Sequence, residues 1–478
     1  MIFNSFPFLI LFVSLFVLYW FLFKNSVKWK NAILLAGSLV FYGYVSWHFL
    51  ILIGCTILST YYFSLQMQTT APGLKRKLLF YLNILASLGT LMYFKYLNFI
   101  IVSMNELFQS ISVKSSLPTL SIIVPLGISF YTFRIISYVL DVDKGKVTAE
   151  KSLLNYALYV SYFPSILSGP IDKFKNFAPQ INNNRQFDES LAIDGCRQFL
   201  WGLFKKLVVA NNCAMYTNMV YADYEHVTAS SLFVGCFVYA FQTYADFSGY
   251  SDMAIGVSKI FGIRIAKNFD FPFFAQSIPD YWRKWHMSLT VWLTEYVFTP
   301  LSITFRDYDK WGLIAAIVIN FVICGIWHGD NWTYVLFGLF HGLYFIPSIL
   351  NGSMNKKAKK SNSNLPTLKE LRGILSTFTI VSLTFILFLS TDIHQAFTIY
   401  KRIFSLEIIS IPLSLNALVY PFLVLMFGVE WFNRYEEYGI STFLVKAKPI
   451  WRYGFYFLLL FAIFVFSGQE QQFIYFKF

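Results

Sequence analysis

Charged residues are scarce in this sequence, since Asp, Glu, Lys and Arg together make up 13% of its 478 residues. A soluble domain of ordinary composition carries about 25%. Hydrophobic residues account for 56% of the chain and aromatic residues for 20%. So few charges cannot cover a globule of this size with polar surface, which excludes an ordinary soluble enzyme, a disordered chain and a collagen-like repeat. The composition predicts an integral membrane protein.

Cysteine and acidic residues are also sparse. The five cysteines are scattered without a CxxC pair, which argues against a disulfide framework and against a metal cluster. Twenty-five acidic residues stand against thirty-eight basic ones, a net charge of +13. In a membrane protein this excess is expected from basic cytoplasmic loops. The sequence has no base-stacking motif, so we expect no nucleic-acid partner.

Long apolar runs are abundant, and they are continuous rather than alternating, which favours membrane-spanning helices over a β-barrel. We therefore predict an all-α polytopic membrane protein with about ten to twelve spans and further interfacial or re-entrant helices around a central funnel. Segments 197–212 and 286–303 are the expected interfacial helices. The predicted spans lie near 6–23, 31–46, 48–66, 78–96, 121–140, 153–168, 230–248, 312–328, 332–350, 371–390, 412–431 and 453–468.

Basic clusters predict the orientation of the spans. The basic residues place these loops in the cytoplasm and the N-terminus outside. They are lysines 24, 28 and 30, the 75–77 cluster, lysines 144 and 146, and lysines 356, 357, 359 and 360. The N-terminal apolar run is too long for a removable signal peptide, and it lacks the basic start and the cleavage site of one. We expect one membrane domain over 1–478, with a motif-rich core at 120–345, a polar linker at 351–370 and C-terminal helices at 371–478.

Polar residues collect in the core, where each costs about 2.5–3.5 kcal/mol at a helix centre. The stretch 241–252 (FQTYADFSGYSD) contains Gln242, Asp246 and Asp252. It is interpreted either as an interfacial loop with helix caps or as a helix break lining a water-filled or substrate cavity. In 268–289, two prolines and an aromatic run argue against a spanning helix. His286 and Arg283 in that stretch are either interfacial anchors or site residues.

His328 is the stronger candidate for chemistry. It ends the apolar run 314–329, with Asn320 two helical turns earlier on the same face and Trp327 beside it. His341 follows on the next predicted helix. A buried, neutral imidazole can take a proton from a hydroxyl, a role worth about 10²–10⁴ in rate. The alternative is a histidine hydrogen-bonded for packing, whereas the spacing of the histidines matches no metal-ligand motif.

These residues fall in longer motifs that resemble the membrane-bound O-acyltransferase family, in particular its bacterial alginate and peptidoglycan O-acetylation branch. The D-alanyl transfer proteins of teichoic-acid modification look similar. Here RKWH stands where RRWH is typical, and GIWHG where GLWHG is typical. The matching motifs are VPLGISFYTF at 124–133, SGP at 168–170, GLFKKLVVA at 202–210, FQTYADFSGYSDMAIG at 241–256, NFDFPFFAQSIPDYWRKWHMSL at 268–289, NFVICGIWHGDNWTYVLFGLFHGLY at 320–344 and QFIYFKF at 472–478.

The resemblance implies a multi-pass enzyme of the cell's inner membrane that moves an acetyl group from a cytoplasmic thioester, acetyl-CoA above all, towards an extracytoplasmic polysaccharide. It implies His328 as the catalytic base and His286 as a second catalytic position. Asn320, Gln242, Asp246, Trp327, His341 and Arg283 are the expected substrate-binding residues. Arg283, Lys284, Lys205 and Lys206 could hold the donor's phosphates. No resident cofactor or metal is expected, and a separate SGNH-type partner would finish delivery to the polymer.

Three alternatives stay open. One is D-alanyl or other acyl transfer from a carrier-protein thioester, within the same family. Another is a secondary transporter, whose polar intramembrane residues would mark an ion path, although no internal repeat is visible. The last is a non-enzymatic scaffold of a cell-wall complex.

Overall fold

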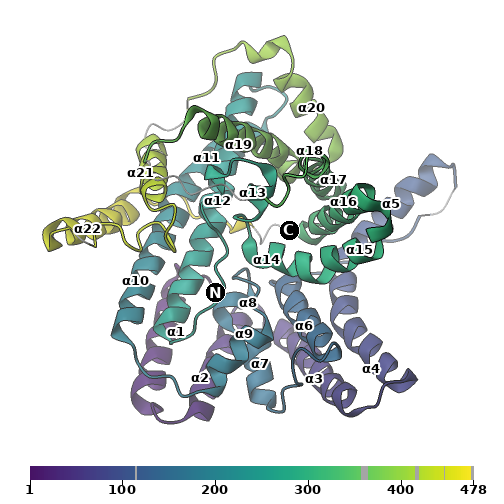
Figure 1. The fold of residues 1–478 in the computed structure, drawn as a ribbon. Coiled ribbons are helices and arrows are strands. Elements are labelled where there is room, and N and C mark those ends of the chain that lie inside the picture. Colours follow the sequence, from purple (N-terminus) through teal and green to yellow (C-terminus); the bar gives the residue numbers. More distant parts are fainter. Residues whose placement is uncertain (114–115, 357–363, 415–418, 446, 475–478) are drawn as a thin grey trace. The chain divides into compact units, whose positions relative to one another are not determined.

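A computed structural model describes residues 1–113, 116–356, 364–414, 419–445 and 447–474. Within these ranges the chain forms helices and no strands, as an all-α protein requires (Figure 1). Contacts group the residues into two compact units, one of Met1–Gly195 with Val257–Ala266 and one of Cys196–Gly256 with Lys267–Phe478. Each unit is described by itself.

The first unit contains the N-terminal helices. Serine side chains cap three of them, because Ser5, Ser26 and Ser152 each accept a hydrogen bond from a backbone N–H in the first turn. Its elements are α1 (Phe6–Val17) with the π-helical turn η1 (Leu18–Leu22), α2 (Val27–Gly43), α3 (Trp47–Thr69), α4 (Leu74–Ile84), η2 (Leu85–Gly89), η3 (Met92–Tyr96), α5 (Leu97–Ser110), α6 (Ile128–Asp143), α7 (Leu153–Ser161), α8 (Phe163–Ile166), α9 (Phe174–Asn182) and the start of α10 (Glu189–Leu203).

Helix α6 is the buried centre of this unit, and it begins later than the predicted span 121–140. Gly127 precedes it with φ +74°, a left-handed conformation that glycine adopts at little cost. A Cβ there would lie 2.3 Å from the carbonyl oxygen of Ile166, so the close approach of α8 also requires glycine. The predicted span 153–168 is likewise divided into α7 and α8, because Pro164 cannot continue a helix from α7.

The second unit contains the motif-rich core and the C-terminal helices. Its elements are the remainder of α10, η4 (Phe204–Ala210), α11 (Asn211–Ala222), α12 (Ala229–Ile260, to Gly256), η5 (Pro272–Phe274), α13 (Ile278–Trp282), α14 (Met287–Leu293), η6 (Thr294–Phe298), α15 (Thr299–Thr304), η7 (Arg306–Tyr308), α16 (Asp309–His328), α17 (Trp332–Leu343), α18 (Ile346–Leu350), α19 (Leu368–Leu389), α20 (Ile393–Ile403), η8 (Leu406–Ile408), α21 (Val419–Phe432) and α22 (Pro449–Phe466).

Helix α12 corrects the interpretation of residues 241–252. The helix runs without interruption from Ala229 to Ile260, so the stretch is neither a loop nor a helix break. Its two acidic residues are tolerated inside the helix because lysines of η4 balance their charges. Asp246 pairs with Lys206 and Asp252 pairs with Lys205, each at 2.6 Å. The segment 197–212, expected at the interface, is the α10–η4–α11 stretch that supplies these buried lysines.

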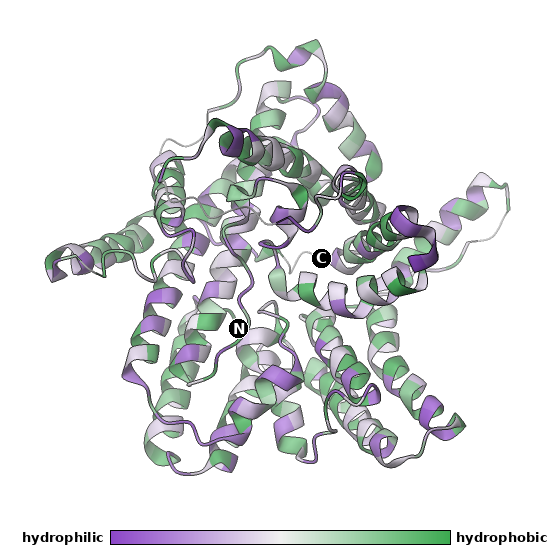
Figure 2. Cartoon of the chain, in the orientation of Figure 1, coloured by the Kyte–Doolittle hydropathy of each residue, from purple (hydrophilic) through white to green (hydrophobic). Residues whose placement is uncertain are grey.

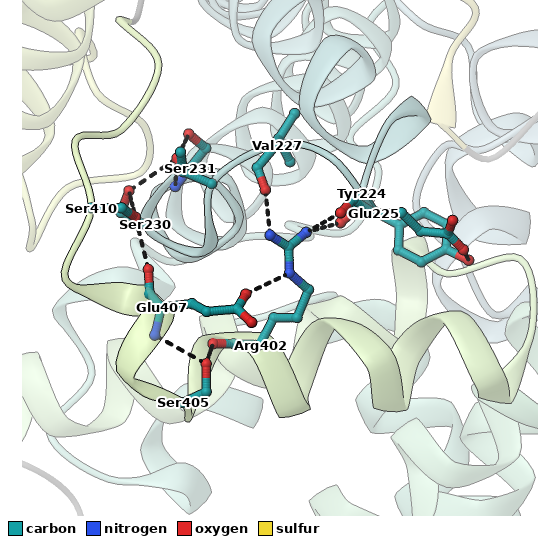
Figure 3. Close-up of polar contacts among 10 residues, drawn as sticks. Tyr224, Glu225, Val227, Ser230, Ser231, Arg402, Ser405, Glu407 and Ser410 are labelled. Carbon is teal, nitrogen blue, oxygen red and sulfur yellow. Dashed lines mark hydrogen bonds and ion pairs between the residues drawn. The ribbon is translucent and has the colours of Figure 1, made fainter.

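The loop that leads into α12 is held by one arginine of α20 (Figure 3). The guanidinium of Arg402 donates to the backbone carbonyl oxygens of Tyr224, Glu225 and Val227 at 2.5, 2.9 and 2.6 Å, and to the carboxylate of Glu407 at 3.0 Å. Carbonyls that would otherwise end a turn without partners are thereby satisfied.

Among the residues that the structure describes, six helical segments are long and apolar enough to cross a membrane, and α1–η1 and α21 are shorter apolar helices. This confirms a multi-pass protein, while the count of ten to twelve spans stays a prediction. In Figure 2 hydrophobic colouring covers much of α22, the yellow helix of Figure 1. The six segments are Trp47–Thr69, Leu74–Ser110, Arg306–His328, Trp332–Leu350, Leu368–Leu389 and Pro449–Phe466.

Candidate active site

Helices α16 and α17 form a tightly packed pair that carries two of the candidate histidines. A Cβ on Gly325 of α16 would lie 2.1 Å from the carbonyl oxygen of Tyr334, and a Cβ on Gly338 of α17 would lie 2.1 Å from that of Phe321. The glycines therefore bring the two backbones together. At the end of α16, Gly329 makes room for the ring of Tyr334, 2.1 Å from where a Cβ would stand.

His328 is the last residue of α16 and is buried. Its Nε2 lies 3.8 Å from Sγ of Cys324, one turn earlier in the same helix. Edge-on contacts with Phe388 and Phe337, whose ring centroids are 5.1 and 6.0 Å away, surround the imidazole with hydrocarbon.

His341 lies one helix further on, and its exposed fraction is 0%. The indole N–H of Trp282, at the end of α13, donates to its Nδ1 at 3.1 Å. Phe337 contacts this imidazole at 4.5 Å between ring centroids and also contacts His328. His328 and His341 are thus joined through one phenylalanine ring.

His286 precedes α14 with φ +43°, a left-handed conformation that costs a residue other than glycine about 1–3 kcal/mol. Its exposed fraction is 0%, and burial lowers the pKa of its imidazole to about 3. Its Nδ1 lies 3.1 Å from Oδ1 of Asn268. The imidazole also contacts the rings of Phe247 at 4.7 Å and Trp327 at 5.6 Å.

Trp327 lies between His286 and His328, since its centroid is 5.1 Å from that of His328. The structure therefore gathers His286, His328 and His341 into one region of the second unit, which we call the histidine cluster. Among the described residues, several buried polar atoms on α16, α17 and α19 lack a hydrogen-bond partner. They are Oδ1 of Asn320, Oγ1 of Thr333, Nε2 of His341 and Oγ of Ser382.

Buried polar groups in folded proteins are nearly always hydrogen-bonded, to protein or to water. The unsatisfied atoms on α16, α17 and α19 are therefore candidates for hydrogen bonds to a substrate. Asn320, expected from its spacing on the face of His328, belongs to this set.

A second group of polar residues, formed by α12 with η4 and α21, is joined by ion pairs and hydrogen bonds. Nζ of Lys205 lies 2.6 Å from Asp252, 3.7 Å from Glu430 of α21 and 2.9 Å from Oγ of Ser248. Tyr244 donates to Glu430 at 2.8 Å. These residues border a cavity of about 20 Å³, room for one water molecule.

Asp246 serves the C-terminal segment. One carboxylate oxygen pairs with Lys206 and the other accepts the backbone N–H of Ile474 at 2.9 Å. Lys206 also donates to the carbonyl oxygen of Gln471 at 3.3 Å. Phe473 packs against Phe247, which in turn contacts His286. Asp246 thus fixes residues 471–474 beside the histidine cluster.

The remaining predicted residues have partners of their own. Gln242 accepts a hydrogen bond from Thr217 of α11 at 2.5 Å. Arg283 donates to the carbonyl oxygens of Pro279, Met354 and Lys356 at 3.1, 2.7 and 3.2 Å, which holds the loop after α18. Lysines 357, 359 and 360 lie outside the described residues.

Three lysines that were expected to hold the donor's phosphates are occupied by ion pairs within the protein. Lys205 and Lys206 are buried, with exposed fractions of 2% and 7%, and both are ion-paired. Neither is available at a rim, and Lys284 pairs with Asp280 at 3.3 Å. Over the described residues no group of three His, Cys, Asp or Glu side chains could hold a metal ion, and all five cysteines are free thiols.

No functional role was predicted for Asn268, Trp282, Tyr244 or Glu430. Asn268 and Trp282 bond directly to candidate histidines, yet they are 18 and 59 residues away from these partners, His286 and His341. Their position inside the same motif, 268–289, was the available signal.

This chain is similar to several known proteins. A model of the membrane-bound O-acyltransferase family matches residues 147–390. A probable alginate O-acetylase of Pseudomonas aeruginosa is 32% identical over 412 residues, which cover 85% of this chain and 75% of that protein. A peptidoglycan O-acetyltransferase of Helicobacter pylori is 29% identical over 463 residues, 90% and 82% of the two chains. A teichoic acid D-alanyltransferase of Streptococcus thermophilus is 31% identical over 291 residues, 55% and 68%.

Proposed function

Because the chain belongs to the membrane-bound O-acyltransferase family and is thus an O-acyltransferase, we propose that it acetylates hydroxyl groups of an extracytoplasmic polysaccharide, alginate-like or peptidoglycan. The observation that carries the proposal is the extent of similarity. The two O-acetylating relatives align with 85% and 90% of this chain, whereas the D-alanyltransferase aligns with 55%. D-alanyl transfer from a carrier-protein thioester remains the second candidate.

The proposed reaction uses His328 as the base. Its neutral imidazole takes the proton of the acceptor hydroxyl as the oxygen attacks the thioester carbonyl. The tetrahedral intermediate then expels the thiolate, which recovers the proton from the imidazolium. The products are an O-acetyl ester and a free thiol, so protons and atoms balance. The burial of His328 and the aromatic rings that contact it support this role, because they keep bulk water away from the base.

Acetyl-CoA is the proposed donor, reached from the cytoplasmic face of the inner membrane. The buried ion pairs of Lys205 and Lys206 leave these two lysines no part in holding its phosphates. The names of the O-acetylating relatives support acetyl as the transferred group, but they do not identify the thioester that donates it. We further propose that an SGNH-type partner outside the membrane completes delivery to the polymer.

The test is His328→Ala, made in the full chain and expressed in its native membrane with the partner genes. We expect normal membrane levels and loss of acetyl ester from the cell-surface polymer, by about 10²-fold or more. The matched control is His226→Ala, because His226 is an exposed histidine paired only with Asp223. Wild-type ester levels in His328→Ala would refute the catalytic role.

The donor is tested with purified protein in lipid vesicles. Acetyl-CoA consumption with release of free thiol supports the proposal. Turnover with a D-alanyl carrier-protein thioester, and none with acetyl-CoA, would establish the second candidate instead.

A further inference from the structure

Two of the clustered histidines have partners whose hydrogen-bonding roles are fixed, and these partners determine where each imidazole carries its proton. A neutral imidazole has one N–H and one bare nitrogen, and the partner of one nitrogen decides the state of the other.

The partner of His286 is an acceptor. Asn268 is fully buried, and its Oδ1 receives the backbone N–H of Ser288 at 3.3 Å and the Ser288 hydroxyl at 2.9 Å. A backbone N–H can only donate, so the atom of Asn268 facing it is the oxygen. The amide nitrogen of Asn268 points the other way and donates to Oγ of Ser251 at 3.1 Å. Nδ1 of His286, 3.1 Å from the same oxygen, must therefore carry the proton.

The partner of His341 is a donor. An indole N–H cannot accept a hydrogen bond, so the nitrogen that faces Trp282, Nδ1 of His341, must be bare. The proton of this neutral imidazole is then on Nε2. That atom is buried, and within the described residues it has no hydrogen-bond partner.

We propose that His286 and His341 are held in opposite neutral tautomers, so that Nε2 of His286 accepts a hydrogen bond from substrate and Nε2 of His341 donates one. Asn268 and Trp282 are the positioning residues that fix this arrangement. The bare Nε2 of His286 suits a neighbouring substrate hydroxyl, because the hydroxyl that receives the acyl group gives its single proton to His328. The buried N–H of His341 suits the thioester carbonyl oxygen as negative charge develops on it. The assignment to hydroxyl and thioester rests on the proposed function, whereas the tautomers do not.

The local backbone supports the assignment for His286. The N–H of Met287 donates to the carbonyl oxygen of Asn268 at 2.8 Å, and that of Asp270 donates to the carbonyl oxygen of Lys284 at 2.9 Å. These bonds tie residues 268–270 to 284–287 on either side of the left-handed His286. The segment that supplies the acceptor and the segment that carries the imidazole are thus held in one register.

The decisive measurement is ¹⁵N nuclear magnetic resonance of the full chain in lipid bilayers, with histidine labelled at the ring nitrogens. Bare and protonated imidazole nitrogens have well-separated ¹⁵N shifts. Single substitutions His286→Gln and His341→Gln assign the two signals among the six histidines. We expect Nδ1–H for His286, unchanged between pH 5 and 8, and Nε2–H for His341. The reverse tautomer or a charged ring at either position would overturn the proposal.

Two variants connect the tautomers to the reaction. Trp282→Phe keeps an aromatic ring but removes the N–H; we expect His341 to populate both tautomers and acyl transfer to fall about 10²–10³-fold. Asn268→Asp keeps an acceptor beside His286 but adds a negative charge that favours the imidazolium. We therefore expect the Nδ1–H to persist, and the acidic limb of the pH–rate profile to move to higher pH.

A merely structural role for Asn268 predicts a loss of folded protein with no movement of that limb, and this outcome would refute its role as a positioning residue. The resonance experiment requires no turnover. If the expected tautomers are observed while neither thioester is consumed, the proposed function fails and the tautomer assignment stands.

Discussion

The close packing of α16 against α17 offers a sharp test of the site, through the substitution Gly325→Ala. The new Cβ would lie 2.1 Å from the carbonyl oxygen of Tyr334 and 3.1 Å from the backbone of Gly338. Both are main-chain atoms, which cannot rotate away as the end of a flexible side chain could. The helices must therefore separate.

The size of the displacement follows from the contact distances. Real Cβ atoms essentially never approach closer than 3.0 Å, and ordinary contact begins at 3.4 Å. Raising 2.1 Å to these values requires a movement of about 0.9–1.3 Å between α16 and α17. Overpacking of this kind costs about 1–3 kcal/mol. A misplacement of about 1 Å in a catalytic arrangement costs on the order of 10²-fold in rate.

We therefore expect Gly325→Ala to reach the membrane with a lowered melting temperature and to lose about 10²-fold in acyl transfer, measured as ester on the polymer or thiol release in vesicles. Gly454→Ala on α22 is the matched control, because a Cβ there meets no atom within 4 Å. Alanine at that position should be neutral or slightly stabilising, by up to about 1 kcal/mol. Wild-type activity and melting temperature in Gly325→Ala would refute the packing argument.

Three further predictions concern stability. Lys205→Met leaves two buried carboxylates without their cation and should lower the free energy of unfolding by about 3–5 kcal/mol in a melting assay. Lys267→Met, at a partly exposed pair, should lower it by about 0–1 kcal/mol. Equal losses of stability in the two variants would contradict this prediction. Burial raises the pKa of Asp172 to about 6 from 3.8. The protonated carboxyl therefore adds about 3 kcal/mol to the free energy of unfolding below pH 3.8, and this stabilisation is lost as the pH rises through 6. Asp172→Asn should abolish this pH dependence of stability, and an unchanged dependence would show that Asp172 is not its source. Arg402→Lys cannot reproduce the three carbonyl contacts and should make the loop 223–228 more sensitive to limited proteolysis, in contrast to Arg306→Lys at an exposed pair.

Much of the fold follows from hydropathy alone. The spans expected near 48–66, 312–328, 332–350, 371–390 and 453–468 coincide with helices, because a long apolar run in a chain this poor in charge has no other stable form. Boundaries were harder to predict. Helix α6 starts seven residues later than the predicted span 121–140, since Gly127 and the carbonyl of Ile166 decide where it begins. No periodicity reveals such a long-range contact.

The proximity of the candidate residues was predictable in part. The three histidines were expected near one another, and ring contacts through Trp327 and Phe337 bring them together. Asp246 was expected to orient the base or substrate, but its carboxylate is engaged by Lys206 and the C-terminal segment. Its partners come from positions 40 and 228 residues away, so sequence spacing could not identify them.

Polar residues in apolar helices look alike in a sequence, and the structure separates them by whether their hydrogen bonds are complete. Lys205, Asp252 and Glu430 satisfy one another, so their cost is offset within the protein and nothing further is required of a ligand. Asn320 and His341 retain buried polar atoms without partners among the described residues. Leaving such groups unsatisfied costs about 1–3 kcal/mol each. A substrate that supplied the missing hydrogen bonds would remove this cost, which makes Asn320 and His341 the residues to test for substrate binding.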